Sequence, residues 1–117
     1  MPGLKNNELI WLGVDLDKTI ADNTGFPKFK LTKPMKGAAN ALRKLKKDGW
    51  KITVFTARAY SEYQEIEDWL NKNKIPFRRI ICGKPLLYRM IDDRNIEFNG
   101  DWEEVINKIN VSKKQNS

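Results

Sequence analysis

Two aspartates one residue apart, Asp15 and Asp17, end an apolar run in the stretch WLGVDLDKTI. Polar groups of a matching kind follow three later apolar runs: Thr56 and Arg58, then Lys84, then Asp92, Asp93 and Arg94. Carboxylates, a hydroxyl group and cationic side chains are the groups that a phosphate and a divalent cation require. They can share one site only if the fold brings the ends of the four runs together.

Phosphoryl transfer needs a nucleophile, compensation of the charge on the transferred group, and an acid for the leaving oxygen. A carboxylate can be the nucleophile, but it repels a phosphate, so we expect a hard cation such as Mg²⁺ to bridge the two. Asp15, one of Asp92 and Asp93, and a main-chain carbonyl could hold that cation. Asp17 is placed to reach the leaving-group oxygen as the acid.

The other polar groups are suited to holding phosphoryl oxygens. Lys84 can neutralise charge on the nucleophile and the phosphate, while the Thr56 hydroxyl and nearby backbone N–H groups can donate hydrogen bonds to the phosphate. Arg58 and Arg94 have two open roles, because each could contact the substrate or pair with the acidic residues. Cys82 is expected to be a small strand residue rather than a nucleophile.

The four runs alternate with helical patterns. Strands are predicted over 9–15, 51–56, 77–82 and 87–93, and helices after Pro34, from Ser61 and after Asp101. Ser61 and Gln64 have the spacing of a capping box, and Asp101 can cap the last helix. This order predicts an α/β, three-layer Rossmann-like fold with a mostly parallel central sheet. Ligands bind such sheets outside the carboxyl ends of the strands, where all the polar groups stand.

The size of the chain fits one domain. Its 117 residues are expected to form a single unit over 1–117, with a core over about 9–109 and a frayed basic tail over 110–117. Lys and Arg outnumber Asp and Glu by 22 to 15, which gives a formal charge of +7. The charge favours attraction to polyanions, and two interpretations stay open: a solvated helix face and loop, or a surface that binds nucleic acid.

Composition also excludes several kinds of site. The chain has no histidine and one cysteine, Cys82, which excludes histidine catalysis, a typical zinc site and an internal disulfide. No apolar run is long enough to span a membrane, and the start MPGLKNNEL does not have the pattern of a secretory signal. Together these features predict a cytoplasmic protein without membrane partners.

The order and spacing of DLDKTI, VFTAR, CGKP and MIDDR resemble the four motifs of the haloacid dehalogenase (HAD) superfamily of phosphohydrolases. The resemblance covers roughly residues 9–109. It implies that Asp15 is the nucleophile and that Asp17 is the general acid–base, with its backbone carbonyl on Mg²⁺. It assigns phosphate binding to Thr56 and Lys84. The resemblance also implies that Asp93 completes the metal site, with Asp92 as the neighbouring carboxylate.

The chain departs from the family pattern at Lys18, where many members have glycine. The Lys18 side chain could add positive charge near the substrate or point to solvent. There is no room for a cap domain after Ile20 or after Thr56. The chain therefore looks like a capless member, similar to the phosphatase domain of polynucleotide kinase–phosphatases and to small phage and bacterial proteins.

An open, capless site can accept a phosphate on a bulky partner. Together with the basic surface, this predicts a phosphorylated nucleotide or nucleic-acid end as substrate, and Phe26 and Phe29 could stack on a base. Three alternatives stay open: a sugar-phosphate phosphatase enclosed by oligomerisation, a phospho-acceptor like a response-regulator receiver, and a non-catalytic basic α/β module that binds nucleic acid. The receiver is disfavoured, because its acidic pair stands at the first strand rather than the last.

Overall fold

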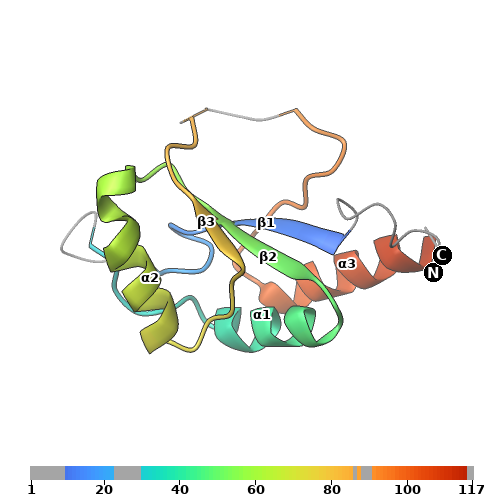
Figure 1. Cartoon of the computed structure of the whole chain (residues 1–117). Helices are drawn as coiled ribbons and strands as arrows, with labels where there is room; N and C mark the ends of the chain where they lie inside the picture. Colours follow the sequence, from blue (N-terminus) through green and yellow to red (C-terminus); the bar gives the residue numbers. More distant parts are fainter. Residues whose placement is uncertain (1–9, 23–29, 86, 88–90, 116–117) are drawn as a thin grey trace.

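A computed structural model of the chain describes residues 10–22, 30–85, 87 and 91–115. The elements, in order, are β1 (Trp11–Asp15), α1 (Ala38–Lys47), β2 (Lys51–Phe55), the short 3₁₀ helix η3 (Tyr60–Glu62), α2 (Tyr63–Lys72), β3 (Arg79–Ile81) and α3 (Trp102–Gln115) (Figure 1). Within the described residues, three strands form one parallel sheet in the order β1-β2-β3. The chain is therefore an α/β protein with an open parallel sheet flanked by helices, as predicted, and it is consistent with a Rossmann-like three-layer fold.

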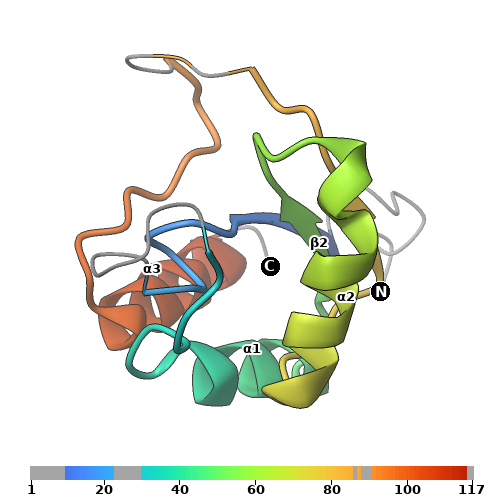
Figure 2. The ribbon, with the colours of Figure 1, turned by 90° about the vertical axis from the view of Figure 1, so that its left-hand side faces the viewer.

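One face of the sheet carries the apolar core. The strand register places Val14 beside Val54 and Val54 beside Ile80, and all three side chains are buried. Helix α1 contacts both β2 and α3, and Figures 1 and 2 show α1 and α3 next to each other on one side of the sheet. Burial of these apolar rows against the helices is the main term that stabilises the sheet.

Glycines with left-handed backbone mark both ends of α1. Gly37, with φ of +82°, precedes Ala38, so the helix begins later than the position of Pro34 suggests. Gly49, with φ of +102°, follows the last turn and donates its N–H to the Lys46 carbonyl. A residue without a side chain adopts this conformation without steric strain, and Gly49 ends the helix as predicted.

The starts of the other helices agree with the sequence in one case only. Asp101 caps α3, because its Oδ1 accepts the N–H of Glu103 at 2.9 Å. The capping box predicted for the second helix is wrong, since α2 has Glu62 at its N-cap and no side-chain cap bond. The Gln64 side chain instead donates to Asp68 Oδ1 at 2.9 Å, one turn further along the helix. Helix α3 continues to Gln115, into the segment predicted as a frayed tail.

The predicted fourth strand over 87–93 lies partly outside the described residues, which leave out 88–90. Its described positions, 87 and 91–93, have no strand conformation, and the Ile91 side chain is fully exposed. From there the segment 91–101 arches away from the sheet before α3 (Figure 1). Asp92 Oδ1 accepts the Arg94 N–H at 2.9 Å, a local bond of the kind that favours a turn over strand pairing.

No helix in the described part of the chain combines the length and the apolar character needed to cross a membrane.

Candidate active site

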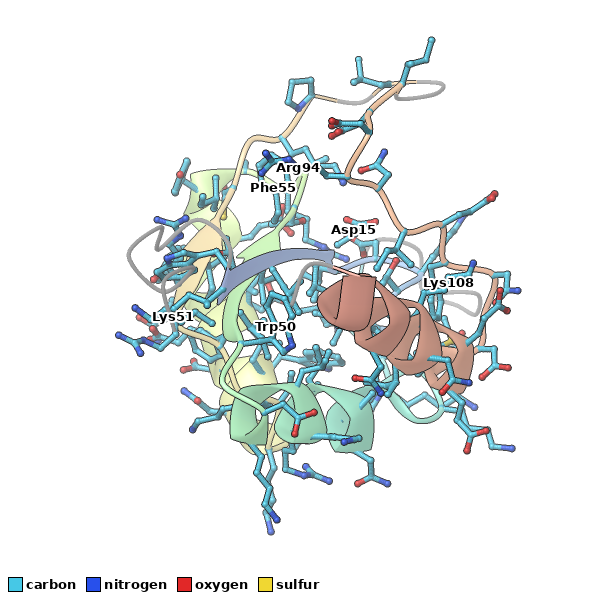
Figure 3. The ribbon with its side chains drawn as sticks, turned by 90° about the vertical axis from the view of Figure 1, so that its right-hand side faces the viewer. Asp15, Trp50, Lys51, Phe55, Arg94 and Lys108 are labelled. Atoms are coloured by element: carbon cyan, nitrogen blue, oxygen red, sulfur yellow. The ribbon has the colours of Figure 1, made fainter. Side chains whose placement is uncertain are left out.

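Asp15 is the last residue of β1, and its carboxylate faces Lys84, which lies in the segment that follows β3. Lys84 Nζ lies 3.3 Å from Asp15 Oδ1, and the Leu16 N–H donates to the same oxygen at 3.0 Å. The Asp15 side chain is still 42% exposed, and it lies at the edge of the sheet (Figure 3). A group from solution can therefore reach this carboxylate beside a positive charge.

Main-chain hydrogen bonds hold the segments after β2 and β3 together. The Thr56 N–H donates to the Ile81 carbonyl, and the Lys84 N–H donates back to the Thr56 carbonyl, both at 2.9 Å. The Gly83 N–H donates to the Arg58 carbonyl at 2.8 Å. Gly83 has φ of +78°, a conformation that glycine adopts without strain. This network fixes the chain that carries Lys84 toward Asp15.

Thr56 is fully buried at the end of β2. Its Oγ1 accepts the Arg58 N–H at 3.1 Å and so stabilises the turn after the strand. Because this side chain is fully buried, a phosphoryl oxygen would have to enter below the protein surface to reach the hydroxyl.

Arg58 pairs with two carboxylates. Its Nη2 lies 2.8 Å from Asp17 Oδ1, its Nε lies 3.0 Å from Asp17 Oδ2, and its Nη1 lies 2.8 Å from Glu62 Oε1. The hydrogen bond to Asp17 raises the pKa of Arg58 above its ordinary value, against the opposing effect of burial. Of the two roles left open for Arg58, the structure shows ion pairing with the site's own acidic residue.

This pairing restricts what Asp17 can do. A general acid has to carry a proton to the leaving-group oxygen, whereas both carboxylate oxygens of Asp17 accept hydrogen bonds from Arg58. Asp17 can act on a leaving group only if one of these oxygens exchanges the guanidinium for that group.

Lys18 stands in a left-handed backbone conformation, with φ of +63°. Its N–H donates to the Ala21 carbonyl at 2.8 Å, which closes the turn after β1, and its side chain is exposed. The glycine that the family pattern has here would adopt the same conformation without strain.

The acidic pair Asp92–Asp93 does not join this group. Both side chains and that of Arg94 are exposed on the segment that leaves the sheet, and Asp92 binds the Arg94 backbone instead. Across the ranges that the structure describes, no three Asp, Glu, His or Cys side chains gather as a possible metal site.

The described residues therefore fit Mg²⁺ only in part. Asp15 offers a partly exposed carboxylate, the type of ligand that Mg²⁺ prefers. The second carboxylate implied by the HAD resemblance, from Asp92 or Asp93, is not grouped with it. Phe26 and Phe29, the two aromatic residues that could stack on a base, lie outside the described residues.

Two residues next to the site, Glu62 and Phe55, were not predicted from the sequence. Glu62 follows Arg58 by four residues, a spacing of opposite charges that could have indicated the ion pair. Phe55 lies opposite Asp15 in the strand register, and Lys84 Nζ lies 5.5 Å from its ring centre. Side chains alternate between the two faces along β2, which places Phe55 on the same face as Asp15. The contact between Lys84 and Phe55 could therefore have been predicted from the sequence.

Cys82 is buried immediately after β3, and burial raises the pKa of its thiol. A thiol that stays protonated at neutral pH is a poor nucleophile, in keeping with the structural role predicted for it.

The fold and this edge of the sheet define an α/β protein with polar groups at the carboxyl ends of parallel strands. A crystal structure of an MCSG target from Vibrio cholerae is similar, with 24% sequence identity and a TM-score of 0.61 over 85% of this chain and 98% of that chain. A likeness at this level of identity shows the fold alone. No protein-family model matches the chain, and no curated protein matches it.

Proposed function

We propose that the chain is an Mg²⁺-dependent phosphomonoester hydrolase of the HAD type that works through an aspartyl phosphate on Asp15. The observation that supports this most is the partly exposed Asp15 carboxylate at the tip of β1, 3.3 Å from Lys84 Nζ. A nucleophilic carboxylate beside a fixed ammonium group is the arrangement that attack on an anionic phosphate requires.

In the proposed reaction an Asp15 carboxylate oxygen attacks phosphorus, and the bond from phosphorus to the leaving oxygen breaks. Asp17, which must first release one oxygen from Arg58 and take up a proton there from solvent, gives that proton to the leaving oxygen. A water molecule then attacks phosphorus, Asp17 accepts the proton of the water, and phosphate leaves with Asp15 restored. Lys84 offsets the negative charge on Asp15 and on the phosphoryl oxygens in both steps.

Mg²⁺, when bound, would lower the repulsion between the Asp15 carboxylate and the phosphate. The residues to hold it are Asp15, the main-chain carbonyl of Asp17, and one carboxylate of Asp92 or Asp93. The proposal therefore requires the acidic pair to come closer to Asp15 than the described arrangement has it. We also propose that the protein is cytoplasmic. Its proposed substrate is a phosphorylated nucleotide or nucleic-acid end.

A second candidate is a non-catalytic basic α/β module that binds nucleic acid. Two observations favour it: Arg58 occupies both oxygens of Asp17, and no group of three metal-binding side chains forms among the described residues. Such a module would keep the fold and the basic surface without turnover.

Release of phosphate from p-nitrophenyl phosphate, with Mg²⁺ or with EDTA, separates the two candidates. The hydrolase predicts release with Mg²⁺, none with EDTA, and none from the Asp15→Asn protein. Asp48→Asn is the control, because Asp48 pairs with Lys44 at the end of α1. Full activity of Asp15→Asn would exclude Asp15 as nucleophile, and no release under any condition would favour the module.

A further inference from the structure

The face of the sheet opposite the Val14–Val54–Ile80 row carries a different set of side chains. The register pairs Trp11 with Lys51, Gly13 with Thr53 and Asp15 with Phe55, and it pairs Thr53 with Arg79. We call the set Trp11, Gly13, Lys51, Thr53, Phe55 and Arg79 the Trp11 face. Figure 3 shows Phe55 and Asp15 on the side of the sheet away from α1. Gly13 and Arg79 are exposed, Trp11, Lys51 and Phe55 are half-buried, and Thr53 is buried.

Cationic side chains are stacked on the tryptophan of this face. The Arg79 guanidinium carbon lies 4.2 Å from the centre of the Trp11 ring, and Lys51 Nζ lies 5.3 Å from it. Arg79 Nε also donates to Thr53 Oγ1 at 2.8 Å, which fixes the guanidinium over the middle strand. Flat aromatic and guanidinium groups held in place are the platforms on which nucleobases stack.

Gly13 leaves the centre of the face flat. There is open space around Gly13: a Cβ atom at this position would have no neighbouring atom within 4 Å. Gly13 also does not have a positive φ. Neither packing nor backbone conformation therefore requires glycine there. Glycine within a strand weakens the strand, and it often marks a place where a ligand approaches the backbone closely.

The charge of the Trp11 face is positive, and no described carboxylate pairs with its two cationic side chains, Lys51 and Arg79. The face leads along β1 and β2 to Asp15 and Phe55, where Lys84 contacts both. A strand rises about 3.3 Å per residue, so the path from Trp11 to Asp15 is long enough for a short strand of nucleic acid.

We infer that the Trp11 face binds single-stranded nucleic acid, whose terminal phosphate lies at Asp15 and Lys84. The bases stack on the Trp11–Arg79 pair and on Phe55, the backbone crosses Gly13, and Lys51 and Arg79 contact phosphates. This assignment names the substrate class of the proposed hydrolase and rests on that function for the reaction. Binding of the strand does not depend on it.

The test is the affinity of the full chain for a fluorescein-labelled, unphosphorylated oligothymidine of about ten nucleotides, measured by fluorescence anisotropy at two salt concentrations. Gly13→Val fills the flat centre with a residue that favours strands, and Arg79→Ala removes the guanidinium. Lys46→Ala, an exposed position on α1, removes the same charge far from the face. Circular dichroism melting checks that each variant is folded.

We expect Gly13→Val and Arg79→Ala each to weaken binding about fivefold or more, and Lys46→Ala to change it less than about twofold. Equal losses for Arg79→Ala and Lys46→Ala would mean that overall charge, not this face, holds the strand, and would overturn the inference. Unchanged affinity in Gly13→Val and Arg79→Ala would overturn it too. So would equal binding of a polyphosphate that has no bases.

These outcomes are independent of the phosphatase assay. If the protein releases phosphate from p-nitrophenyl phosphate with Mg²⁺, but substitutions in the Trp11 face do not change oligothymidine binding, only the inference about the Trp11 face is contradicted. Binding that depends on the face, without phosphate release, would contradict the hydrolase alone.

Discussion

Arg58 binds Asp17 through two of its nitrogen atoms, with Nη2 2.8 Å from Oδ1 and Nε 3.0 Å from Oδ2. The pair joins the turn after β1 to the turn after β2, and the Arg58 side chain is only 9% exposed. Planar, two-point contacts of this kind are the stronger class of ion pair. Arg58 therefore links the two strand tips that carry Asp15 and Thr56.

Replacing Arg58 by alanine is expected to lower the free energy of unfolding by about 1–2 kcal/mol, because Asp17 and Glu62 are each about one-third exposed and water screens part of the loss. The raised pKa of Arg58 keeps its guanidinium charged at neutral pH, so on the alkaline side this contribution is lost only as pH rises into strong alkali. Urea denaturation measures the change. Lys44→Ala, which breaks the exposed ion pair between Lys44 and Asp48, should lower the free energy of unfolding by less than about 0.5 kcal/mol. Equal losses in the two variants would show that the ion pairs of Arg58 contribute no more than an ordinary surface ion pair.

Glycine at position 18 is expected to stabilise the protein by about 0.5–1 kcal/mol. The change relieves the left-handed strain at Lys18, part of which is offset by the greater freedom of the unfolded chain. Lys74→Gly is a matched variant, because Lys74 has φ of +58°, and it should behave in the same way. Thermal melting of both proteins makes the comparison. A loss of stability in Lys18→Gly alone would mean that the Lys18 side chain contributes to the fold.

Apolar runs and helical patterns were enough to predict β1, β2, β3, α1, α2 and α3, because burial of apolar side chains decides those elements. They also predicted that Asp15 and Lys84 would meet, since parallel strands end at one edge. The capping box at Ser61 failed, because a 3₁₀ turn moves the start of the helix to Tyr63. The bidentate geometry of Arg58 on Asp17 could not be predicted, since it depends on how two turns approach in space.

Thr56→Val should lower the free energy of unfolding by about 1–2 kcal/mol, because the isosteric side chain leaves the Arg58 N–H without its Thr56 Oγ1 acceptor. Thr56→Ser keeps the oxygen and is expected to restore most of the loss. Chemical denaturation of the two variants under one set of conditions gives the difference. Equal stability of Thr56→Val and wild type would show that the hydroxyl does not hold the turn.

The Cys82 thiol should make stability depend on alkaline pH. Burial, with the charge of Glu62, raises the pKa of Cys82 in the folded chain, so the stability that the neutral thiol contributes is complete below the ordinary pKa of about 8.5 and falls as pH rises above it. The gap in free energy of unfolding between wild type and Cys82→Ala is therefore expected to narrow above that pH. A gap that stays constant would place the thiol in contact with water.

Trapping of the aspartyl phosphate tests the hydrolase most directly. Wild-type protein that turns over a phosphomonoester with Mg²⁺ is quenched and reduced with borohydride, which converts an acyl phosphate of aspartate to homoserine, and the peptide that contains Asp15 is sequenced by mass spectrometry. We predict homoserine at position 15, none at position 17, and none when substrate is left out. Turnover with an unmodified Asp15, or with the modification at another aspartate, would contradict Asp15 as the nucleophile.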